Sequence, residues 1–196
     1  MLALTVQQPW ATLIAHGPKR WENRQWEPRP DEGPPLYPGD YLALHAGREV
    51  SPESWWDALE LAEAHGILDT LPLLAGFRKR VNLTAGYGRV QLVRAHRKKY
   101  MTEACPYGAI VAVVTFHGVD EVVPGAVSDD PWKQGPLAWR LGHVTPIAPV
   151  PCPGHPKLWT LPPHVLAAVT DAWKEAVAVE SSPPRPGPER TGLTPT

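Results

Sequence analysis

Short apolar blocks, separated by turns rich in Pro and Gly, recur along this chain and predict a protein built mainly from strands. Residues 2–6, 41–46 and 109–116 are mostly apolar or β-branched, which is typical of strands in a protein core. Weaker strand patterns occur at residues 89–95, 117–123, 137–141, 143–147 and 157–161. These blocks are sufficient for one sheet of several strands.

Helical spacing of apolar residues is found in a smaller part of the chain. A short helix is expected over residues 9–16, because Pro9 suits a first helical turn and Gly17 suits a helix end. The other helical segments are residues 51–66, residues 67–77 with a break at Pro72, and the amphipathic residues 163–177. The pattern therefore predicts an α+β protein that is mainly β.

The length and the distribution of residue types favour a single domain. The chain has 196 residues, which is enough to bury a sizeable core. We expect one domain over residues 1–179, with an insertion at about residues 51–106. Residues 180–196 are rich in Pro and poor in apolar residues, so a disordered tail is expected there.

Cysteine content and hydropathy bear on where the protein works. Cys105 and Cys152 are the only cysteines, and no secretory signal opens the sequence. No apolar run approaches the roughly 18 residues that a membrane-spanning helix needs. We therefore expect reduced thiols, a cytoplasmic location and no contact with a membrane.

Charged and aromatic residues are concentrated in residues 17–24, Gly-Pro-Lys-Arg-Trp-Glu-Asn-Arg. If residues 19–26 form a strand, alternation places four side chains on one face, namely Arg20, Glu22, Arg24 and Trp26. A turn after Pro18 would let the Lys19 ammonium reach the Glu22 carboxylate. The alternative is an exposed strand with an ordinary surface ion pair, which would contribute less than about 1 kcal/mol.

A second concentration of charge lies in the expected insertion. Residues 70–102 contain eight Lys or Arg and no Asp or Glu, so the rest of the chain carries a net charge of −9 against −1 overall. Such a run would attract phosphates, with an affinity that falls as salt rises. The alternative is a solvated insertion that binds nothing. The residues singled out are Arg78, Lys79, Arg80, Arg97, Lys98 and Lys99.

Patterns typical of metal, phosphate-loop and nucleophile chemistry are weak. Cys152-x-x-His155 is a single local pair with ligand spacing, and no second pair lies near it. Thr84-Ala-Gly-Tyr-Gly lacks the Gly-Lys-Ser/Thr ending of a phosphate loop. Cys105 precedes a proline and has no obvious base. We therefore expect neither a metal nor a cofactor.

The order of several motifs resembles the ASCH domain family. The signature Gly-x-Lys-x-x-Glu-x-Arg follows Gln8-Pro9-Trp10, as in that family. Similar blocks follow in family order at residues 39–46, 108–114, 149–154 and in Pro131-Trp132-x-x-Gly135-Pro136-x-x-Trp139. The resemblance implies a PUA-like β-barrel with flanking helices, here with a basic insertion, that binds RNA or a modified nucleobase.

This resemblance gives the residues of the signature an expected function. We expect Lys19, Glu22 and Arg24 to line a cleft in which Glu22 accepts from an exocyclic amine and the two cations hold phosphate or ribose. The aromatic residues that could stack on an unpaired base are Trp21, Trp26 and Trp132. His45 is either a packing residue at a strand end or a further cleft residue.

The same residues leave an enzyme open as the alternative. One branch of the family resembles amidohydrolases that remove the acetyl group of N4-acetylcytidine with a Lys and a Thr three residues later. Lys19 matches, but Glu22 stands in place of that Thr, and would have to act as a general base for water. A ribonuclease is also open, with Glu22 as base and Lys19 and Arg24 stabilising the phosphorane. A third possibility is an interaction protein with a vestigial pocket.

Overall fold

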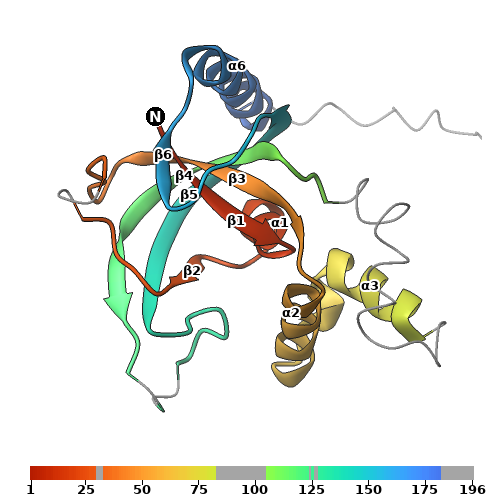
Figure 1. Cartoon of the computed structure of the whole chain (residues 1–196). Coiled ribbons are helices and arrows are strands. Elements are labelled where there is room, and N and C mark those ends of the chain that lie inside the picture. The colour runs from red at the N-terminus through yellow and green to blue at the C-terminus, as the bar shows by residue number, and fades with distance from the viewer. Residues whose placement is uncertain (30–32, 83–104, 124, 126–127, 182–196) are drawn as a thin grey trace, which may run out of the picture.

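A computed structural model describes residues 1–29, 33–82, 105–123, 125 and 128–181 (Figure 1). Over these residues the chain forms an α+β fold with six strands and four α-helices, in agreement with the predicted class. The strands are β1 (Leu2–Gln8), β2 (Trp21–Arg24), β3 (Tyr41–Val50), β4 (Ala109–Glu121), β5 (Leu137–Pro151) and β6 (Leu158–Thr160). The helices are α1 (Trp10–His16), α2 (Pro52–Ala64), α3 (Pro72–Asn82) and α6 (Pro163–Glu180), with a 3-10 turn at Leu68–Thr70.

The strands form one mixed sheet in the order β2-β5-β4-β3-β1-β6. β1 runs parallel to β3, and the other neighbours are antiparallel. The two long strands β4 and β5 curve around one side of the molecule (Figure 1). In the described part of the chain β2 and β6 are edge strands, so strand pairing does not close the sheet and the expected barrel is not confirmed.

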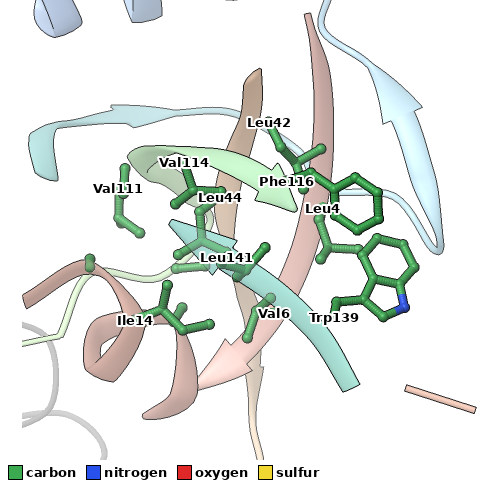
Figure 2. Close-up of a cluster of buried hydrophobic side chains, with 14 of the residues drawn as sticks. Leu4, Val6, Ile14, Leu42, Leu44, Val111, Val114, Phe116, Trp139 and Leu141 are labelled. Atoms are coloured by element: carbon green, nitrogen blue, oxygen red, sulfur yellow. The ribbon is translucent and has the colours of Figure 1, made fainter. Parts of the chain in front are cut away.

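The three strongest apolar blocks form strands, as predicted. Both faces of these central strands are covered by other apolar side chains. Leu4, Leu42 and Leu44 belong to a cluster on the side of α1, which Figure 2 shows. Ala3 and Ala43, which alternate with them, pack on the side of α6. A strand between two apolar layers needs no polar face, and this explains the continuous apolar runs at residues 2–6, 41–46 and 109–116.

Three strand predictions were wrong in their bounds. Residues 117–123 do not form a separate strand, because β4 continues to Glu121 across a register shift near Gly118, whose φ is 113°. Residues 137–141 and 143–147 are one strand, β5, with an irregularity at His143, whose φ is 39°. In both cases a bulge shifts the alternation of side chains and imitates a strand boundary.

The helices largely follow their predictions. The break at Pro72 is confirmed, since the 3-10 turn precedes it and α3 begins at it. α6 continues to Glu180, three residues beyond the predicted end. None of the described helices is long and apolar enough to cross a membrane. The predicted strand at residues 89–95 falls outside the described residues, as does the predicted tail over residues 180–196 except for Glu180, which ends α6, and Ser181.

A buried glutamine caps α1 from the end of β1. The Gln8 side-chain oxygen accepts from the backbone N–H of Thr12 at 3.0 Å, and its amide nitrogen donates to the Pro106 carbonyl at 2.7 Å. Gln8 is fully buried, so both bonds satisfy groups that have no access to water. α1 is thereby fixed against the sheet just before the charged segment that follows it.

Candidate functional site

The charged segment begins where α1 ends. At Gly17 an added Cβ would lie 2.7 Å from the Leu13 carbonyl oxygen, so only glycine lets the chain leave the helix this closely. Arg20 donates to the carbonyl oxygens of Ile14 at 3.3 Å and Gly17 at 2.7 Å. Arg20 therefore caps α1. The strand pattern had predicted that Arg20 shares a face with Glu22, and this prediction is wrong because the guanidinium turns to the helix end.

The buried carboxylate of Glu22 contacts the cations of both Lys19 and Arg24. Glu22 Oε2 lies 3.2 Å from Lys19 Nζ, and Glu22 Oε1 lies 3.0 Å from an Arg24 Nη atom. Lys19 also donates to the Trp21 carbonyl, and Arg24 donates to the Thr5 carbonyl at 2.6 Å. Lys19 is 2 % exposed and Glu22 is 7 % exposed. The alternative of an ordinary exposed surface pair is therefore wrong.

Burial dominates the electrostatics of this cluster. It lowers the pKa of Lys19 from the usual value, and the Glu22 carboxylate opposes that change. Arg24 adds a second cation, which also lowers the pKa of Lys19. Removal of the carboxylate would thus leave two cations facing each other in a region with little water.

Two cavities meet at Glu22. The smaller, of about 150 Å³, is lined by Lys19, Glu22, Trp10, Asn23, Trp132 and Gln134, among others. The larger, of about 870 Å³, extends from Glu22 and Arg24 across β1 and β3 to residues 153–157. Trp10, Glu22 and Asn23 belong to the walls of both. The carboxylate therefore stands at the boundary between a narrow chamber and a wide cleft.

The predicted aromatic residues are divided among different places. Trp132 lines the small chamber, where it meets the Trp10 ring edge-on with 6.3 Å between centroids. Trp26 lines the wide cleft. Trp21 lines neither of these two cavities; its indole N–H donates to Asp130 at 3.0 Å, and Lys133 Nζ lies 4.5 Å from its ring centroid.

His45 forms part of the wall of the wide cleft and is 1 % exposed. Burial lowers its pKa, with the nearby Arg48 and His155 acting in the same direction and the hydrogen bond to the Cys152 carbonyl opposing them. Nε2 lies 3.1 Å from that carbonyl, which can only accept, so Nε2 carries the proton. In the neutral ring Nδ1 is then an acceptor, and it has no hydrogen-bond partner among the described residues.

The predicted basic surface is only partly within the described residues. Arg78 forms an ion pair with Glu63 of α2 at 2.5 Å, and Lys79 is exposed on α3. The side chain of Arg80, together with Arg97, Lys98 and Lys99, lies outside the described residues. A basic face continuous with the cleft thus stays a prediction.

Sequence reasoning missed two polar residues of the small chamber. The Asn23 amide nitrogen donates to the Trp132 carbonyl at 3.1 Å, and its oxygen accepts from the Gln134 backbone N–H at 2.9 Å. Asn23 therefore fixes the loop that carries Trp132. Its place inside the signature was a usable signal, whereas nothing in the sequence near Gln134 pointed to the chamber.

Among the described residues, no group of three or more His, Cys, Asp or Glu is placed to hold a metal ion. Cys152 offers its backbone carbonyl to His45, and its buried thiol has a raised pKa because of burial. The exposed His155 packs edge-on against Trp159, with 5.0 Å between ring centroids.

Comparison with known families supplies one match. The ASCH domain model matches residues 4–119. No curated protein matches the chain. The matched span includes α1, the Lys19–Glu22–Arg24 cluster and His45, while Trp132 and residues 153–157, which complete the two cavities, lie beyond it.

Proposed function

The chain belongs to the ASCH domain family, and from that premise we propose that the cleft around Lys19, Glu22 and Arg24 binds RNA or a modified nucleotide. ASCH domains are generally thought to bind RNA, which supports nucleic-acid binding in general. The observation that supports this particular site is the position of Glu22, buried between two cations at the boundary of a narrow chamber and a wide cleft.

The small chamber suits a planar group with hydrogen-bonding edges. Its walls include the rings of Trp10 and Trp132, the Glu22 carboxylate and the amide of Gln134. At about 150 Å³ it is smaller than the roughly 300–1,000 Å³ usual for pockets that hold whole small molecules. A base or its substituent would enter the chamber, and the sugar would remain in the wide cleft.

Glu22 is the residue best placed to recognise that base. Each oxygen of the carboxylate already accepts one hydrogen bond or ion pair from the protein. A carboxylate has about four lone-pair sites, so it can accept further from an exocyclic amine. Lys19 and Arg24 hold the carboxylate in one orientation, and this pre-organisation limits the entropy lost on binding.

The proposal is tested by incubating the protein with bulk RNA and a panel of modified nucleosides, with bound ligands and products read by mass spectrometry. Wild type is compared with Glu22→Gln, and Glu175→Gln on the exposed surface of α6 is the matched control. For a binding protein we expect no products. The preference of Glu22→Gln among bases should change by about 1–3 kcal/mol, roughly 5–150-fold.

Two other results would contradict this proposal. An unchanged base preference in Glu22→Gln would mean that the carboxylate does not meet the ligand. Cut RNA or a deacylated cytidine from wild type, with turnover lowered about 10²–10⁴-fold in Glu22→Gln while binding persists, would establish the hydrolase instead.

A further inference from the structure

The cations of the signature are already bound within the protein. Lys19 is 2 % exposed and donates to Glu22 and to the Trp21 carbonyl. Arg24 donates to the Thr5 carbonyl and forms an ion pair with Glu22. For either cation to neutralise a phosphate, a buried ion pair would have to be broken, which is strongly unfavourable. Phosphate recognition therefore needs other residues.

The wide cleft carries two exposed cations on its other side. Arg48 comes from the end of β3, and Lys157 comes from the turn before β6. His155 and the exposed carboxylate of Glu49 also line this cleft. Both cations at this rim of the cleft are exposed, so a phosphate can reach them without the breaking of a buried ion pair.

The backbone next to each of these cations adopts a positive φ angle. At Gly108, whose φ is 66°, an added Cβ would lie 2.8 Å from Arg48 Cγ and 3.0 Å from its Nε, so the Arg48 side chain lies directly across this glycine. Lys157 has a φ of 56°, in the left-handed region that costs a non-glycine residue about 1 kcal/mol or more. Such positions occur often at ligand sites.

An aromatic ring lies between the rim and a neighbouring hollow. Trp26 lines the wide cleft and also an adjoining cavity of about 220 Å³, whose wall includes Lys157 and Pro156. Its ring meets Trp139 edge-on, with 4.8 Å between centroids and an interplanar angle of 79°. Trp26 therefore offers a fixed aromatic surface next to a cation.

We propose that Arg48 and Lys157 hold the backbone phosphate of single-stranded RNA, while a neighbouring base stacks on Trp26. This inference rests on the proposed function, because it places the recognised base at Glu22. A base within a duplex would have to be extruded before it entered the small chamber. The ligand is then a strand of at least two nucleotides, and a free nucleoside fills only part of the site.

The test measures binding of a labelled single-stranded RNA of about ten nucleotides over a range of salt concentrations. In the double variant Arg48→Gln/Lys157→Gly, glycine suits the left-handed backbone and removes the ammonium. Because the variant lacks the cations that neutralise this one phosphate, the slope of log K against log salt should become less steep by about 0.7. Lys174→Gln, exposed on α6, is the control and should leave the slope unchanged.

Two companion measurements separate this inference from the proposed function. Affinity for free nucleosides should be the same in wild type and the double variant, and wild type should bind the strand more tightly than any nucleoside. Glu49→Gln should tighten strand binding, because it removes the opposing charge at the rim. Equal affinity for strand and nucleoside, or an unchanged slope in the double variant, would overturn the phosphate site and leave base binding at Glu22 intact. If neither ligand binds, both proposals are wrong.

Discussion

Glu22→Leu is expected to lower the free energy of unfolding by about 3–5 kcal/mol, because it leaves two buried or half-buried cations without their carboxylate. Lys19 is almost fully buried, and burial already lowers its pKa. For a chain of this length the midpoint of thermal unfolding should fall by roughly 6–20 °C, as measured by calorimetry.

A double variant separates the charge effect from the loss of packing. In Lys19→Met/Glu22→Leu the buried ion pair is replaced by apolar side chains, while Arg24 loses its carboxylate partner and the Trp21 carbonyl loses its lysine donor. Apolar replacement of a whole buried pair is often neutral or stabilising. The double variant should therefore be more stable than Glu22→Leu alone. If it is less stable by the sum of the two single changes, the two side chains are not coupled in the folded protein.

Trp139→Ala is expected to cost about 3–5 kcal/mol and to weaken RNA binding at the same time. Trp139 is fully buried and packs against Phe116, with 5.5 Å between ring centroids. Its indole N–H also donates to the Trp26 carbonyl at 3.1 Å. The change therefore creates a cavity in the core and releases the ring that we assign to base stacking.

Trp139→Phe distinguishes these two consequences. It keeps most of the core volume but removes the donor to Trp26, so stability should fall less than in Trp139→Ala. Denaturant unfolding gives the stability, and fluorescence anisotropy of labelled RNA gives the affinity. Normal RNA affinity in a folded Trp139→Ala protein would show that the position of Trp26 does not matter for binding.

Local patterns were sufficient for the part of the site that is close in sequence. The turn after Pro18 and the alternation along β2 predicted that Lys19, Glu22 and Arg24 would meet, and they do. Arg20 escaped this reasoning, because the open carbonyls at the end of α1 attract its guanidinium. A strand pattern contains no information about a helix end that lies beside it.

The far wall of the cleft depends on contacts between distant segments. His45 reaches the cleft because β3 pairs parallel with β1, and Lys157 because residues 153–157 cross back over that pair before β6. Gly154 allows the approach, since an added Cβ would lie 2.3 Å from the His45 ring. No short motif encodes a contact between segments this far apart in the chain. Of the residues on this far wall, the sequence therefore predicted only His45.

The measurement that tests the central claim most directly is photocrosslinking of a thiouridine-substituted single-stranded RNA to the wild-type protein. Crosslinked peptides are then identified by mass spectrometry. We predict adducts on the peptides that carry Trp10, Trp26 or Trp132, which line the two cavities at Glu22. These adducts should diminish when unlabelled RNA competes. Adducts confined to α6 or to other segments remote from the cleft would contradict the assignment of this cleft as the RNA site.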